Sequence, residues 1–386
     1  MKETFAQVVN EFKKEIMKYF PDIAEELELV VAIHTSLNIK EISQPVAIFL
    51  MGPPASGKTT TLELIKPLND VIWRDNFTPA ALVSGVKDMD PEEMLLYQLN
   101  EHTLVVPEFA PLSQNQNAKQ IMADLTRLCD SNGLIRQTGF GDIGFSKHMR
   151  FNLIFATVRF DEKSYTLMST MGPRLLTIRF TKKKQSFADI SKRLVKISQE
   201  RPYSEKLEIG CKIVQTFMNK ISKIYPNGIS INSKMDDSST VQTIADYSQL
   251  LAMLRGLVIK QGREFTSEVI KEDPQRCFTT LITIARSLSF IRGRSFISPQ
   301  ELSMIKRIVF DSADPNRVNI LKNLLKNGSI STSKFVKDSG LSRATVYRRF
   351  HELVLLGLCN FTKKPTKSKP ESCIILDEKW KFLEER

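Results

Sequence analysis

Met51-Gly52-Pro53-Pro54-Ala55-Ser56-Gly57-Lys58-Thr59-Thr60 is the most specific motif in this sequence of 386 residues. It fits the pattern G-x-x-x-x-G-K-[ST] at every fixed position. The apolar run 46–50 precedes it, and a helix-compatible run at 60–65 follows it. A strand, a glycine-rich loop and a helix in this order predict a phosphate-binding loop. The alternative, a Gly/Pro turn before an ordinary helix, does not account for the context on both sides.

Each part of this motif has a chemical role. The two glycines let the backbone curl so that N–H groups point at phosphate oxygens, and the positive end of the following helix adds to this field. Lys58 is expected to reach the β- and γ-phosphates, and the Thr59 hydroxyl is expected to bind Mg²⁺. We therefore predict that ATP and Mg²⁺ are bound by Gly52, Pro53, Pro54, Ala55, Ser56, Gly57, Lys58, Thr59 and Thr60.

Composition excludes several classes of protein. A hydrophobic content of 42% and a charged content of 25% are typical of a soluble globular protein, and the length predicts two or three domains. No apolar run approaches the ~20 residues of a membrane span, and the N-terminus does not have the pattern of a secretory signal. The five cysteines are scattered, and none pairs with a histidine at zinc spacing. We expect an intracellular, cytoplasmic protein without disulfides or structural zinc.

The pattern of apolar residues predicts four segments. Residues 41–184 alternate between strands and helices, which indicates an α/β nucleotide-binding core with a largely parallel sheet. Residues 1–40 read as helices that cover this core, and residues 185–311 read as helical throughout, typical of an all-α lid. Residues 315–386 form a separate C-terminal domain. Strands are predicted within the core at 46–50, 71–73, 104–108, 151–158 and 175–180, with a hairpin at 133–148.

Two polar side chains follow predicted core strands. Glu108 ends the strand at 104–108, where a carboxylate would polarise the attacking water or contact the metal through a water molecule. Thr157 ends the strand that begins near residue 151, where its hydroxyl would contact the γ-phosphate or that water. The alternatives are an exposed glutamate and an ordinary threonine, each at a strand end. Glu108 and Thr157 are therefore candidate catalytic residues, and Thr59 and Glu108 are candidate metal ligands.

Two arginines complete the candidate catalytic set. Arg174 follows a turn in Gly172-Pro173-Arg174-Leu175-Leu176, and an arginine at a domain edge can stabilise transition-state charge in a neighbouring subunit. Arg276 opens a predicted helix in Pro274-Gln275-Arg276, from which it would reach the γ-phosphate. Taken singly, either residue would be interpreted as an ordinary surface arginine, and only the order of the motifs favours the catalytic role.

The C-terminal domain has the pattern of a winged helix-turn-helix. Predicted helices at 316–325, 331–338 and 343–354 are separated by Gly328 and Gly340, and two β segments follow around a lysine-rich loop. From residue 315 onward there are 15 Lys and Arg against 7 Asp and Glu, so +8 of the net charge of +12 lies here. Such a charge balance favours a polyanion partner. Candidate DNA-binding residues are Ser342, Arg343, Thr345, Arg348, Arg349, Lys363, Lys364 and Lys367.

The order of these motifs resembles that of the AAA+ ATPase superfamily over roughly residues 40–311. Within it, the chain is most similar to the branch that contains MCM helicases and related mobile-element ATPases. The resemblance implies a ring or spiral of identical subunits with ATP at the interfaces. It makes Arg174 an arginine finger acting in trans and Arg276 a sensor in the lid. Pro107 stands where the family usually has a metal-orienting Asp, which bears on the rate of hydrolysis more than on nucleotide binding.

In helicase relatives a hairpin before the Thr157 strand touches DNA in the central channel. The segment 133–148 is in that position and contains Arg136, Lys147 and His148. An ordinary surface hairpin is the alternative.

The leading hypothesis is an ATP-hydrolysing, Mg²⁺-dependent oligomer that acts on DNA as a helicase- or initiator-like motor. Its winged helix would bind duplex DNA, and single-stranded DNA could occupy a channel. An alternative is an ATP-gated DNA-binding switch in transcription, transposition or defence, with slow turnover or none. In a third, the winged helix binds a protein.

Overall fold

The computed structural model describes residues 4–84, 90–138, 141–145, 148–160, 172–181, 186–188, 191–192, 195, 201–261, 264–364 and 371–383. The chain forms two compact units: Met1–Ile244 with Thr279–Ile305, and Ala245–Phe278 with Lys306–Arg386. The predicted segments 1–40 and 41–184 lie in the first unit, 315–386 lies in the second, and 185–311 is divided between them. Among the described residues, no helix has the length and apolar character needed to cross a membrane.

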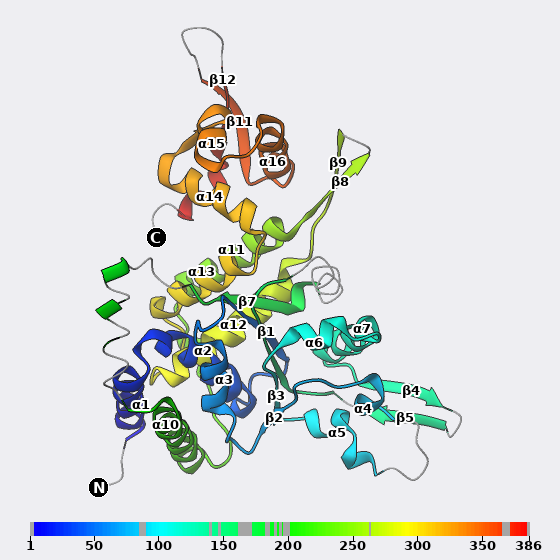
Figure 1. Cartoon of the computed structure of the whole chain (residues 1–386), viewed down its shortest axis with the longest axis vertical. Helices are drawn as coiled ribbons and strands as arrows, with labels where there is room; N and C mark the ends of the chain where they lie inside the picture. Colours follow the sequence, from blue (N-terminus) through cyan, green and yellow to red (C-terminus); the bar gives the residue numbers. More distant parts are fainter. Residues whose placement is uncertain are drawn as a thin grey trace. The chain divides into compact units, whose positions relative to one another are not determined.

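A five-stranded parallel sheet forms the centre of the first unit, with the strand order β2-β3-β6-β1-β7 (Figure 1). The prediction of an α/β core with a parallel sheet is confirmed. β1, β3 and β6 are buried along their whole length, so both faces of the sheet are covered. Strands buried on both faces have nearly continuous apolar sequences, as these do. The strands are β1 (Val46–Met51), β2 (Val71–Trp73), β3 (Thr103–Val106), β6 (Asn152–Thr157) and β7 (Leu175–Arg179).

Helices between these strands pack on the sheet. The Phe49 ring of β1 lies against the Phe155 ring of β6, with their centroids 4.8 Å apart. It also lies 4.9 Å from the ring of Phe109, in the helix that follows β3. All three phenylalanines are fully buried, so they mark the core of this layer. The helical elements are α3 (Lys58–Ile65), α4 (Pro79–Leu82), η3 (Pro91–Glu93), α5 (Leu95–Leu99), α6 (Phe109–Gln114), α7 (Ala118–Cys129) and η4 (Gly172–Arg174).

The N-terminal helices belong to the same unit as the sheet. Thr4 begins the first helix with a capping box, and Phe12 stacks on Phe217 of α10 at a centroid distance of 4.1 Å. The second helix is buried along nearly its whole length. The predicted helical cover over residues 1–40 is therefore present as α1 (Phe5–Tyr19), η1 (Pro21–Ile23), α2 (Ala24–Thr35) and η2 (Ser36–Asn38), with α10 (Tyr203–Ile224) against α1.

The hairpin predicted at 133–148 is confirmed as β4 (Leu134–Thr138) and β5 (Gly141–Phe145), which pair antiparallel. Arg136, a candidate DNA contact by resemblance, donates to the carbonyls of Pro79 and Val83 at 2.8 and 3.1 Å and pairs with Asp124. Its side chain therefore anchors the hairpin to its own unit. Lys147 lies outside the described residues, and His148 Nε2 lies 2.9 Å from the Ser43 carbonyl.

The prediction of a helical pattern throughout 185–311 is wrong over one stretch. β8 (Leu257–Gln261) and β9 (Glu264–Ile270) form an antiparallel hairpin there. Leu257-Val258-Ile259 and the run ending in Val269-Ile270 are rich in β-branched residues, which favour strands. The segment also contains η5 (Ser233–Met235), α11 (Ser238–Arg255), α12 (Pro274–Ile291), η6 (Pro299–Glu301) and α13 (Leu302–Asp311).

The C-terminal elements of the second unit occur in the predicted order. Asp314, Ser331 and Ser342 cap the three helices with side-chain hydrogen bonds, whereas Gly328 and Gly340 end two of them at positive φ. Two of the strands follow the helices, and an additional short strand between the first two helices completes a three-stranded antiparallel sheet of order β10-β12-β11. The elements are α14 (Pro315–Asn327), β10 (Ser329–Ser331), α15 (Thr332–Ser339), α16 (Arg343–Leu355), β11 (Cys359–Lys364), β12 (Glu371–Leu376) and η7 (Glu378–Leu383).

Candidate functional sites

The carboxyl ends of three neighbouring strands meet at one edge of the parallel sheet. Met51 at the end of β1 is in register with Thr157 at the end of β6, and Val106 of β3 is in register with Phe155. The segment 52–57, Glu108 and Thr157 therefore follow adjacent strands. β1 lies between β6 and β7, both of which come much later in the chain. This position is the topological switch point at which parallel sheets bind ligands.

Both glycines of the loop at 52–57 occupy positions that exclude a side chain. A Cβ on Gly52 would lie 2.8 Å from the Phe180 carbonyl oxygen. Gly57 has a φ of 100°, and a Cβ there would lie 2.4 Å from Cγ2 of Ile23. The loop is thus tightly enclosed by β7's C-terminal extension on one side and by η1 on the other.

The N-terminus of α3 has no side-chain cap. Gly57 is the N-cap residue and, having no side chain, leaves the first N–H groups of the helix without a side-chain acceptor. The Thr59 side chain is exposed in this first turn, and the Thr61 hydroxyl donates to the Gly57 carbonyl at 2.9 Å. Such an uncapped helix end attracts anions through its N–H groups and its dipole.

Lys58 is folded over the loop and is only 6% exposed. Its Nζ donates to the Gly52 and Pro53 carbonyl oxygens at 2.6 and 3.0 Å. Burial lowers the pKa of the Lys58 ammonium from its ordinary value, and the charge of Glu108 partly offsets this effect. The ammonium group is therefore held beside the loop by neutral carbonyls, with one carboxylate within electrostatic range.

Glu108 and Thr157 lie at the predicted sheet edge. Glu108 is exposed and caps α6, where its Oε1 accepts from the Ala110 N–H at 3.4 Å. Thr157 is buried, its carbonyl accepts from the Gly52 N–H at 3.2 Å, and its hydroxyl donates to the Arg159 carbonyl at 3.1 Å. Both residues therefore lie near the loop, and the Thr157 hydroxyl is hydrogen-bonded to the backbone just after its own strand.

Of the two candidate arginines, one is paired within the first unit and the other belongs to the second unit. Arg174 forms a bidentate ion pair with Asp130, in which Nε–Oδ1 and Nη2–Oδ2 are both 2.7 Å. The guanidinium is about four-fifths buried in this pair, so it is held by a carboxylate of its own chain. Arg276 lies in the first turn of α12 and belongs to the second unit, and its predicted contact with the γ-phosphate stays a prediction.

Sequence reasoning missed Tyr203, which contacts the helix that follows the loop. The Tyr203 hydroxyl lies 2.7 Å from the Thr60 hydroxyl and 3.2 Å from Oε2 of Glu63. Burial is the main cause that raises the pKa of this phenol. No sequence signal could have found the contact, because 143 residues separate Tyr203 from Thr60.

The predicted DNA-binding residues that the structure describes lie on α16, at its N-cap and on β11. Arg343 and Arg348 are exposed, Ser342 caps the helix, and Thr345 is half-buried beside it. Lys363 is exposed on β11, Lys364 ends that strand, and Lys367 lies outside the described residues. The DNA contact predicted for Arg349 stays a prediction, and this side chain is half-buried in an ion pair. Its Nη1 is 2.9 Å from Oε2 of the buried Glu352, whose charge requires a partner.

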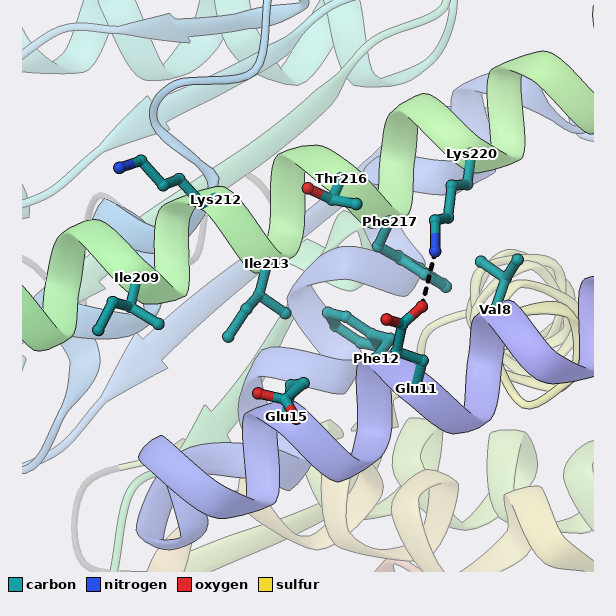
Figure 2. A pocket seen from close by; sticks show the side chains of 10 residues that line it. All are labelled: Val8, Glu11, Phe12, Glu15, Ile209, Lys212, Ile213, Thr216, Phe217 and Lys220. Carbon is teal, nitrogen blue, oxygen red and sulfur yellow. Dashed lines mark hydrogen bonds and ion pairs between the residues drawn. The ribbon is translucent and has the colours of Figure 1, made fainter. Parts of the chain in front are cut away.

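A groove runs between α1 and α10 (Figure 2). Its volume is about 320 Å³, and the Glu11–Lys220 ion pair of 2.6 Å spans it. None of the predicted site residues lines it. The lining side chains are Val8, Glu11, Phe12, Glu15, Ile209, Lys212, Ile213, Thr216, Phe217 and Lys220.

A scan against protein-family models found no family that matches this chain, and a search of curated proteins found no match either.

Proposed function

We propose that this chain is a Mg²⁺-dependent ATPase of the AAA+ type that acts on DNA as a homo-oligomer. One observation supports the nucleotide part: the N-terminus of α3 has no side-chain cap and lies at the switch point of the sheet. The loop before it has glycines where a side chain would clash, and the buried Lys58 ammonium lies beside this loop. A triphosphate would suit this site because backbone N–H groups, the positive end of a helix dipole and an ammonium group converge at the loop.

Each residue at the site has a role in this proposal. Lys58 would exchange its carbonyl partners for phosphate oxygens, and this exchange would give the ammonium group negatively charged partners. Thr59 and Glu108 would hold Mg²⁺, which neutralises charge on the phosphates when bound. Glu108 would also orient the attacking water, since its exposed carboxylate follows the strand next but one to β1.

The DNA part of the proposal rests on the second unit. Three capped helices and a three-stranded sheet in the order of a winged helix-turn-helix present the exposed Arg343 and Arg348 on α16. The basic charge of this segment supports a phosphate-rich partner.

One observation favours the alternative of an ATP-gated switch with slow turnover. Pro107 precedes Glu108 where a second carboxylate would help to orient the metal, and the Glu108 side chain caps α6. In that reading, ATP binding controls assembly on DNA, and hydrolysis is rare.

ATPase rates measured without DNA, with single-stranded DNA and with duplex DNA distinguish the two functions. Lys58→Ala is expected to abolish nucleotide binding, and Glu108→Gln is expected to keep binding while turnover falls by at least tenfold. Lys119→Ala and Glu92→Gln change exposed charges outside the site and serve as matched controls. Turnover that stays negligible under all conditions, with ATP still bound, rejects the motor in favour of the switch.

Mixed oligomers test whether Arg174 acts in a neighbour's site. Arg174→Ala and Lys58→Ala subunits each damage a different half of a shared site, so mixing them is expected to restore part of the activity. Unchanged turnover in Arg174→Ala alone would show that this arginine has only its structural role with Asp130.

A further inference from the structure

Three aromatic side chains form a cluster between α16 and β11 in the second unit. Tyr347 and His351 are one helical turn apart, and Phe361 lies on the strand. The Tyr347 ring is 5.7 Å from the Phe361 ring and 6.4 Å from the His351 ring, with interplanar angles of 22° and 25°. The Tyr347 ring is therefore nearly parallel to both neighbours, whereas the His351 and Phe361 rings are tilted by 38° to each other.

This cluster differs from the domain's apolar core. Core aromatics such as Phe335 and Phe350, whose ring centroids are 5.7 Å apart, are almost completely buried. Tyr347 is 50% exposed, and Ala344, one turn before it, is exposed and too short to cover the ring. The Tyr347 ring thus stays half exposed to water beside the partly buried His351 and Phe361, although the same domain buries other rings.

Exposed cations occur close to the cluster on both elements. Arg348 is next to Tyr347 in α16, about 100° further around the helix axis, and is exposed. Lys363 is exposed two residues after Phe361, and side chains two apart lie on the same face of a strand. Aromatic rings beside cations are the combination with which proteins hold unpaired nucleic-acid bases: the rings stack on bases and the cations bind the backbone.

A paired base offers only its edge to a helix in the major groove, and hydrogen-bonding side chains read that edge. A flat ring gains most from a base whose face is open. We propose that Tyr347, His351 and Phe361 form a stacking platform for an unpaired nucleobase, with Arg348 and Lys363 on its phosphates. The C-terminal domain then prefers DNA with unpaired bases, such as a fork, over a continuous duplex. This inference rests on the proposed function, because it takes DNA as the partner.

The test uses the full chain and two DNA probes of the same sequence, a fork and a continuous duplex. Each carries 2-aminopurine, which is unpaired in the fork. Fluorescence anisotropy measures affinity, and 2-aminopurine fluorescence reports stacking. The unaltered protein is expected to bind the fork more tightly and to quench its fluorescence. Tyr347→Ala is expected to weaken fork binding about tenfold, to leave duplex binding within twofold and to abolish the quenching.

Two further variants separate stacking from charge. Tyr347→Phe keeps the ring and is expected to retain fork preference and quenching. Arg348→Ala is expected to weaken binding to both probes, because phosphate contacts do not depend on base pairing. Circular dichroism checks that Tyr347→Ala is folded, which its exposed position favours.

The outcomes distinguish this inference from the function on which it rests. If both probes bind equally and Tyr347→Ala changes neither, the stacking platform is refuted and DNA binding stands. Equal losses on both probes would assign Tyr347 to duplex binding and also refute the platform. If the chain binds neither probe, the DNA function fails first, and the aromatic cluster then belongs to a protein-binding surface.

Discussion

At the scale of single residues, Lys58 shows how burial sets the chemistry of a charged group. Its Nζ is held by the carbonyls of Gly52 and Pro53, and burial lowers the pKa of its ammonium. Neutral carbonyls stabilise an ammonium less than phosphate oxygens would, because phosphates carry full negative charge. The residue is therefore arranged to prefer an incoming anion to its present partners.

A pH dependence of nucleotide affinity follows from this lowered pKa. Phosphate binds the protonated form of Lys58, so affinity is expected to fall as pH rises through the pKa of the free protein, which lies below the ordinary value of 10.5. Calorimetric titration with a non-hydrolysable ATP analogue between about pH 7 and 10 measures this. Lys119→Ala should keep the alkaline decline. A flat affinity profile in the unaltered protein would contradict the assigned role of Lys58.

At the scale of elements, the junction of β1 and α3 depends on contacts from two distant segments. Gly57 turns the chain at positive φ directly against Ile23 of η1, and Gly52 packs against Phe180 beyond β7. A side chain at Gly57 would therefore meet both backbone strain and a steric clash. The N-terminal cover is in this way part of the loop's surroundings.

Gly57→Ala is expected to lower the free energy of unfolding by more than Gly141→Ala, and to abolish nucleotide binding. The two glycines have similar φ values of 100° and 105°, but a Cβ on Gly141 would have nothing within 4 Å. Backbone strain costs about 1–2 kcal/mol at either site, and the clash with Ile23 adds about 1–3 kcal/mol at Gly57 only. Urea unfolding of both variants measures the difference. Equal losses would show that Ile23 moves aside at little cost.

At the scale of the whole molecule, a largely buried ion-pair network joins α2 to the segment that runs from the end of α12 to η6. Arg292 lies 2.6 Å from Oε2 of Glu28 and 3.2 Å from Oε1 of Glu301, which also pairs with Arg294. Burial alone would lower the pKa of Arg292, but the two carboxylates outweigh it and raise that pKa. Segments more than 260 residues apart are held together through this guanidinium.

Arg292→Ala is expected to destabilise the first unit by about 3–5 kcal/mol, because it leaves the fully buried Glu301 and the partly buried Glu28 with fewer compensating charges. Lys212→Ala removes an exposed ion pair with Glu208 and should change the free energy of unfolding far less, because water screens the two charges. Chemical unfolding followed by circular dichroism compares them. Similar losses in both variants would mean that the network contributes no more than a surface pair.

Much of the fold could be predicted because its signals are local. The five core strands are short apolar runs, Thr4, Ser331 and Ser342 cap helices through neighbouring N–H groups, and Gly328 and Gly340 end helices at positive φ. The β8–β9 hairpin was missed because short apolar runs fit either a helix or a strand.

The sequence by itself determined the loop at 52–60, the order of elements and the basic character of the last segment, since these depend on residues within a few positions of one another. Only the tertiary structure decided which distant groups meet. It placed Thr157 beside Gly52, Tyr203 beside Thr60, and Ile23 against Gly57. It also paired Arg174 with Asp130 and Arg349 with Glu352. Such partners follow from strand order and from the need of buried charges for compensation, which no periodicity along the chain encodes.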